Sequence, residues 1–295
     1  MRNEIRKKPL LLIYHLSFLI FILFSCSSSP DLPEEVFSIR NMASRQLDLA
    51  NRTATQGRFG DALLIVEDAR RLALSTDDPV LLIQTATARA NFLFSLGRYD
   101  EAFQNWEAAR DEGEIAGFPD LAILAQIYSA RGRLMLLNNP TEAAVLEIQD
   151  QIRFYISSIR SDPQVQASGW LVMGMVEKEL QHYSEAEAAA RRSLDIHVRN
   201  RNLEDAAYDW YFIASIHSVA GRYDDALAAL RNAINYDRRA ENGYGLASSW
   251  EAMGEVYIRT GNYTEAARAF NRAADIYQAI GLEDLSIKAA ARSQN

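Results

Sequence analysis

Few side chains in this sequence are of the types that catalysis or metal binding requires. The chain has four histidines and one cysteine among 295 residues. His182, His197 and His217 do not stand at the His-x-x-x-His spacing that places two metal ligands on one helix face. The sequence also contains no phosphate-binding loop, no dinucleotide fingerprint and no Gly-x-Ser-x-Gly nucleophile motif. We therefore expect a protein that is not an enzyme and that has no metal site and no cofactor.

The single cysteine, Cys26, follows a segment that differs from the rest of the chain. Residues 1–8 carry four basic side chains and one acid, and residues 9–24 form a nearly continuous apolar run. This order is typical of the basic and hydrophobic regions of a secretory signal. The run is shorter than the roughly 20 residues that a membrane-spanning helix needs.

The residues Leu23-Phe24-Ser25-Cys26 resemble the signal of a bacterial lipoprotein, with Phe24 where a small residue is more usual. The resemblance implies a signal peptide over residues 1–25 and lipidation of Cys26, followed by a flexible tether to residue 36. Ser27, where Asp would mark inner-membrane retention, implies the outer membrane, facing the periplasm. An uncleaved signal anchor and an ordinary signal peptide with an incidental cysteine remain as alternatives.

Composition limits the remaining function classes. The chain is 48% hydrophobic and 24% charged, which is typical of a globular protein rather than a disordered one. Its net charge is −8, whereas a nucleic-acid-binding surface needs a basic face. We therefore expect no nucleic-acid partner.

A short phrase recurs along the chain at steps of 40, 42, 42, 40 and 40 residues. Its six copies begin at Gly57, Gly97, Asn139, Gln181, Gly221 and Gly261, and the copy at Gly97 reads Gly-Arg-Tyr-Asp-Glu-Ala. Glycine ends a helix by adopting the left-handed conformation. Asp100 and its counterparts are good N-cap residues for a following helix. Each copy therefore predicts a corner between two helices.

Small residues recur at helical spacing on both sides of the corners, as at Gly254 and Ala266 around the last copy. Such residues let antiparallel helices approach closely. With Trp250, Tyr257 and Phe270, this last copy resembles the tetratricopeptide repeat, in an extended form of 40–42 residues. The resemblance implies an all-α, right-handed α-solenoid over residues 37–292, with about six helix pairs and a capping helix over 283–293. The third copy, at Asn139, matches least well.

The resemblance also implies a concave groove lined by the first helix of each pair. The residues that we expect in it are Asn51, Gln84, Asn91, Phe94, Gln126, Arg133, Met175, Tyr208, Tyr211, Phe212 and Glu255. Amides and arginine can pair with a bound backbone, and aromatic rings can anchor side chains.

These features favour a protein–protein interaction scaffold that is attached to the membrane by its lipid and binds a peptide or protein segment. The alternative is an accessory subunit of a periplasmic transport system that passes a small ligand. An apolar tunnel converging on Met175, Tyr211 and Phe212 would favour the alternative, and an open polar trough would favour the scaffold.

Overall fold

The computed structural model describes residues 37–294. By its internal contacts the chain divides into two units, residues 1–38 and residues 39–295. The predicted signal peptide, the lipidated Cys26 and the tether to residue 36 lie outside the described residues. No described helix is both long enough and apolar enough to cross a membrane.

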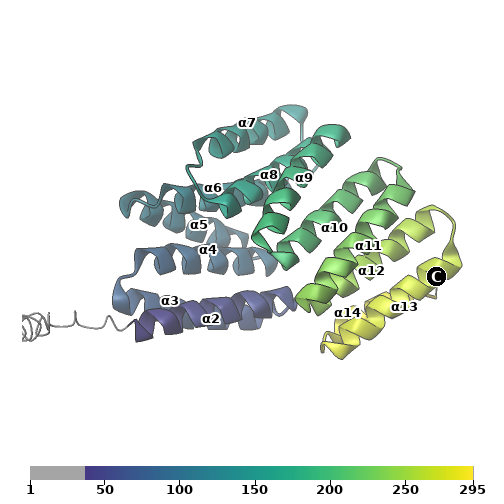
Figure 1. Ribbon diagram of the computed structural model, residues 1–295, viewed down its shortest axis with the longest axis horizontal. Helices are drawn as coiled ribbons and strands as arrows, with labels where there is room; N and C mark the ends of the chain where they lie inside the picture. Colours follow the sequence, from purple (N-terminus) through teal and green to yellow (C-terminus); the bar gives the residue numbers. More distant parts are fainter. Residues whose placement is uncertain (1–36, 295) are drawn as a thin grey trace, which may run out of the picture. The chain divides into compact units, whose positions relative to one another are not determined.

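The described residues form 13 helices and no strand, which confirms the all-α prediction. Successive helices lie side by side and pack as pairs (Figure 1). The helices are α2 (Ser38–Thr55), α3 (Phe59–Thr76), α4 (Pro79–Ser95), α5 (Tyr99–Ile115), α6 (Pro119–Leu136), α7 (Glu142–Ser158), α8 (Pro163–Glu179), α9 (Tyr183–Asn200), α10 (Leu203–Val219), α11 (Tyr223–Ala240), α12 (Gly243–Arg259), α13 (Tyr263–Ala279) and α14 (Glu283–Arg292). The final helix α14 packs on α13, as expected of a capping helix.

The predicted corners join the two helices of each pair. Gly97, Gly221 and Gly261 have φ angles of 76°, 74° and 74°, in the left-handed region that glycine adopts without steric cost. Gln181 takes the same conformation with φ 62°, so the fourth corner forms without glycine.

The starts of the second helices α5, α9, α11 and α13 differ from the prediction. We expected Asp100 and its counterparts to be the N-cap residues, but α5 begins at Tyr99 with Arg98 at the N-cap. The acid of the first turn pairs with this arginine instead, and Arg98 Nε donates to Glu101 Oε1 at 2.7 Å. The acidic residues thus stabilise the first turn of the helix rather than capping it.

Small residues bring the helices of a pair into close contact, as predicted. Ala226 and Ala266 are buried. A methyl group added at Gly254 would lie 2.7 Å from the ring of Phe270 in its partner helix. One added at Gly174 would lie 3.1 Å from the backbone oxygen of Ala186 in its partner helix and 3.0 Å from the ring of Phe212 in the next pair. The large rings therefore occupy space that a side chain at either glycine would fill.

The third repeat is longer than the others and shifts our predicted register. The spacing between the starts of successive first helices shows this. It is 40 residues from α4 to α6, 44 residues from α6 to α8, and 40 residues at each later step up to the cap α14. In the pairs on either side, the corner residue follows the start of the first helix by 18 residues, as from Pro79 to Gly97. The same spacing from Pro119 gives Leu137, two residues before the corner that we predicted at Asn139.

The extra residues widen this corner. The connection runs from Leu137 to Thr141, and Thr141 Oγ1 caps α7 by accepting from the Ala144 amide at 3.3 Å. As a result α6 packs more extensively on α5 than on its own partner α7, unlike the first helix in the pairs that follow.

Candidate functional site

A cavity of about 590 Å³ lies among the first helices of the pairs, and we call it the inner hollow. It brings together residues that are far apart in the sequence. Its lining consists of Asn51, Ala54, Thr55, Phe59, Phe92, Arg131, Glu204, Asp205, Ala207, Tyr208, Tyr211, Asp237, Asn242, Tyr244, Gly245, Ser248 and Ser249. The corner between α2 and α3 packs closely against α12. A methyl group added at Gly57 in this corner would lie only 2.9 Å from the ring of Tyr244.

Tyrosine rings form one wall of the inner hollow. The rings of Tyr208 and Tyr211 stack with centroids 6.4 Å apart and an interplanar angle of 23°. Tyr208 is 47% exposed, which leaves it free to contact an occupant. Since Tyr208 and Tyr211 are three residues apart in α10, one helix face presents both rings.

Charged groups occupy the same lining. Burial raises the pKa of Glu204, the neighbouring charge of Asp205 adds to this, and Arg52 opposes it. Burial also raises the pKa of Asp237 to about 7, although Asn242 Nδ2 donates to its Oδ1 at 2.8 Å. Arg131 lies 5.0 Å from the ring centroid of Tyr128, and its buried Nε has no hydrogen-bond partner among the described residues.

A second cavity of about 490 Å³ adjoins the inner hollow and shares Tyr211, Tyr244 and Ser248 with it. We call it the C-terminal hollow, because α14 contributes Arg292 to its lining. Arg292 Nη1 lies 3.2 Å from Glu251 Oε1, and Nη2 pairs with Glu255. The guanidinium carbon of Arg292 also lies 4.6 Å from the ring centroid of Phe270.

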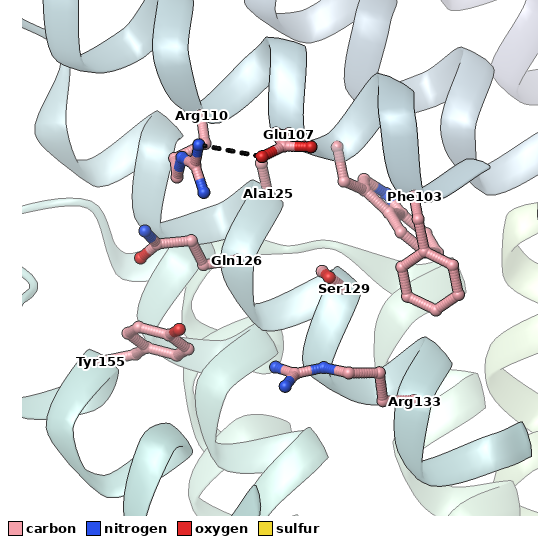
Figure 2. Close-up of a pocket in the computed structure, with 9 residues that line it drawn as sticks. Phe103, Glu107, Arg110, Ala125, Gln126, Ser129, Arg133 and Tyr155 are labelled. Atoms are coloured by element: carbon pink, nitrogen blue, oxygen red, sulfur yellow. Dashed lines mark hydrogen bonds and ion pairs between the residues drawn. The ribbon is translucent and has the colours of Figure 1, made fainter. Parts of the chain in front are cut away.

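A third cavity, of about 340 Å³, is lined by residues of α5 and α6 and by Tyr155 of α7 (Figure 2). Its polar lining includes Arg110, Gln126, Ser129, Arg133 and Tyr155. Figure 2 shows these side chains around the cavity, with Arg110 paired to Glu107. We call it the α5–α7 hollow.

The α5–α7 hollow corrects two of our predicted groove residues. Gln126 and Arg133 line it together with residues of α5 and α7, and not the inner hollow. The two-residue shift in the third repeat explains the error, since two residues correspond to about 200° of rotation around a helix. In α6 it is Arg131 that lines the inner hollow. The sequence signal for this shift was the distance from the proline that begins a first helix to the following corner, which is 18 residues from Pro79 to Gly97.

The other predicted groove residues fall into different environments. Asn51, Tyr208 and Tyr211 line the inner hollow, and Glu255 lines the C-terminal hollow. Gln84 is exposed.

Several of the predicted residues take part in helix packing. Asn91 Oδ1 accepts a hydrogen bond from Trp106 Nε1 at 3.2 Å, and the ring of Phe94 lies 5.6 Å from that of Trp106. Met175 packs against the core cluster of α9–α13. Phe212 was predicted wrongly, because its side chain is buried against Gly174 rather than open to a groove.

One buried cluster contains the residue types of a catalytic triad but not its geometry. Asp209 lies between its two partners: Ser193 Oγ donates to Asp209 Oδ1 at 3.0 Å, and His197 Nδ1 lies 2.6 Å from Asp209 Oδ2. A triad needs the imidazole next to the hydroxyl, so that the base can accept its proton. Burial opposes a charge on His197, but the hydrogen bond and the charge of Asp209 outweigh it and raise the His197 pKa. The cluster joins α9 to α10.

Within residues 37–294 no group of three or more His, Cys, Asp or Glu side chains is arranged to hold a metal ion.

Comparisons with known proteins agree with this architecture. Residues 204–279 match a tetratricopeptide repeat family model. The Rap protein solved with competence and sporulation factor superposes with a TM-score of 0.54 at 15% identity, covering 84% of this chain and 69% of that chain. The apo form of RapI gives 0.54 at 12% identity, covering 86% and 71%. PilW, a type IV pilus biogenesis factor, gives 0.47 at 16% identity, covering 84% and 97%. No curated protein matches the sequence.

At these identities the structural likeness concerns the fold. The chain is an all-α solenoid in which 13 described helices pack pairwise as tetratricopeptide-like repeats.

Proposed function

We propose that this protein is a scaffold for protein–protein interaction and that it binds a peptide or protein segment in the inner hollow. The observation that carries the proposal is the lining of that hollow, where the stacked Tyr208 and Tyr211 rings lie among amide, hydroxyl and charged side chains. A few residues, among which tryptophan, tyrosine and arginine are enriched, supply most of the binding energy in protein interfaces, and polar groups surround them. The proposal assigns the protein no catalytic activity and no cofactor.

The fold is compatible with this role. The similar Rap protein was solved in a complex with competence and sporulation factor, so a solenoid of this kind can hold a partner. The match of residues 204–279 to the tetratricopeptide repeat covers α10 and α12, which supply nine of the 17 lining residues, including all three tyrosines.

A role as a small-ligand carrier has less support from the geometry. We expected it to require an apolar tunnel converging on Met175, Tyr211 and Phe212. Phe212 is buried in the core instead, and the cavity beside Tyr211 carries Glu204 and Asp205. These features favour the scaffold.

The test of the scaffold is partner capture by the variant Tyr208→Ala with Tyr211→Ala. Affinity purification from crosslinked cell envelopes should recover a specific partner with the wild-type chain and at least tenfold less with this variant. The matched control is Tyr99→Ala with Tyr263→Ala, which removes two exposed tyrosines at helix corners. Circular dichroism should show the same helix content in all three proteins. Equal capture by both double variants would contradict the scaffold role of the inner hollow.

We also propose that Cys26 anchors the protein in the bacterial envelope, with the solenoid facing the periplasm from the outer membrane. The support is the order of a basic segment, an apolar run and the residues Leu23-Phe24-Ser25-Cys26. Two or three acyl chains hold a protein stably, because each buried CH₂ contributes about 0.8 kcal/mol.

Metabolic labelling with a palmitate analogue tests this anchor. Label should enter the wild-type chain and be lost from Cys26→Ala, and fractionation should move that variant out of the membrane pellet. Equal labelling of the two proteins would show that Cys26 is not the lipidation site.

A further inference from the structure

Acidic side chains outnumber basic ones in the inner hollow. Its lining contains the carboxyls of Glu204, Asp205 and Asp237 and a single basic residue, Arg131. Among residues 37–294 the side chain of Glu204 forms no hydrogen bond or ion pair, and burial raises its pKa although the charge of Arg52 opposes this, so a cation in the hollow would stabilise its charge further.

Aromatic ring faces accompany these acids. Tyr208, Tyr211 and Tyr244 all line the hollow, and the first two present one stacked pair. The face of an aromatic ring attracts a guanidinium or ammonium group, most strongly where water is partly excluded. Acids beside tyrosine rings therefore favour arginine and lysine side chains over neutral or acidic ones.

The adjoining C-terminal hollow already holds such a group, supplied by the protein itself. The guanidinium of Arg292 pairs with Glu251 and Glu255 and lies against the ring of Phe270. Both acids belong to α12, which also lines the inner hollow. The C-terminal hollow therefore holds an arginine between carboxyls and an aromatic ring, and in the adjoining inner hollow carboxyls also lie beside aromatic rings.

We propose that the partner segment bound in the inner hollow is a basic peptide, held by Glu204, Asp205 and the tyrosine faces, and that Arg292 competes with it for Glu251 and Glu255. The proposal rests on the scaffold function above and names the chemistry of the partner. Charge complementarity determines which segments enter, and the aromatic contacts add affinity.

Three labelled octapeptides test this inference by fluorescence anisotropy with the full chain in a mild nonionic detergent. The basic peptide is Ala-Arg-Ala-Lys-Ala-Arg-Ala-Lys, and the other two replace each Arg and Lys by Glu or by Gln. The basic peptide should bind at least tenfold more tightly than either of the others. Its affinity should fall as salt increases, because charges at this surface are screened.

Variants then locate the binding. Glu204→Gln should weaken binding of the basic peptide at least threefold. The control Asp195→Asn removes an equal charge from an exposed position on α9 and should change it less than twofold. Arg292→Ala should tighten binding at least threefold, whereas Arg272→Ala, on the exposed side of α13, should not. Thermal melting of each variant checks that the fold is retained.

The contrary outcomes are distinct. Equal effects of Glu204→Gln and Asp195→Asn would show that binding follows net charge alone, and would overturn the proposal. So would an absence of binding by all three peptides, or unchanged affinity in Arg292→Ala. If the acidic or neutral peptide binds best and Tyr208→Leu abolishes that binding, the basic partner is wrong but the scaffold function stands. The scaffold function itself fails only if the tyrosine double variant captures its partner normally.

Discussion

Buried carboxyl groups show how hydrogen bonds and the cost of burial oppose each other at single residues of this structure. Asp209 has two partners, the hydroxyl of Ser193 and the imidazole of His197, and burial still raises its pKa. Asp237 has one side-chain donor, the amide of Asn242. Burying a carboxylate is costly unless hydrogen bonds or opposite charges compensate for it. The single donor does not compensate fully at Asp237, and burial raises the pKa of this group to about 7.

The raised pKa of Asp237 predicts a loss of stability as the pH rises. The folded protein binds a proton on Asp237 more tightly than the unfolded chain does, so the stabilisation is complete below about pH 4 and is lost as the pH rises towards 7. Asp237→Asn keeps an oxygen that can accept from Asn242 and removes the charge. We expect the variant to be more stable than the wild type at pH 8, by a few kcal/mol at most, at about 1.4 kcal/mol per pKa unit.

Melting temperatures from pH 4 to pH 8 provide the check on Asp237. The difference between Asp237→Asn and the wild type should grow through this range, and the exposed control Asp195→Asn should show no such growth. Parallel curves for Asp237→Asn and the wild type would contradict the assignment of the buried charge.

At the scale of helices, local sequence rules predicted the repeated unit well. The helix corners and the close contacts at alanine and glycine follow from conformational preference and side-chain size. These properties act within a few residues, so a recurring phrase reveals them. The N-cap residues were misplaced because the corner aromatic, as at Tyr99, begins the second helix.

The third repeat shows where this local reasoning fails. Asn139, Pro140 and Thr141 aligned with the recurring phrase, but the corner of this repeat is longer than the others. Because of this shift of two residues, we assigned Gln126 and Arg133 to the groove side of α6 and did not predict Arg131, which lines the inner hollow. An alignment anchored on the helix starts at Pro79, Pro119 and Pro163 would have avoided this error.

At the scale of residues 39–295, the inner hollow depends on rotations that accumulate from one helix pair to the next. The sequence predicted that Asn51, Tyr208 and Tyr211 would line a groove. It could not predict that Asn51, in the first pair, would face the same cavity as Tyr244, in the last. Packing between neighbouring helix pairs sets the small rotation of each repeat relative to the next. The spacing of residues within one repeat does not reveal the sum of these rotations.

We propose that the partner lies against α10 and α12 in the inner hollow, and site-specific photocrosslinking tests this claim most directly. A photoreactive phenylalanine analogue at Ser248, which lines both the inner and the C-terminal hollows, is compared in living cells with the same analogue at Gln126 in the α5–α7 hollow. We predict a discrete crosslinked partner from Ser248 and none from Gln126. A partner crosslinked from Gln126 and not from Ser248 would place binding on the other side of the solenoid and contradict the claim.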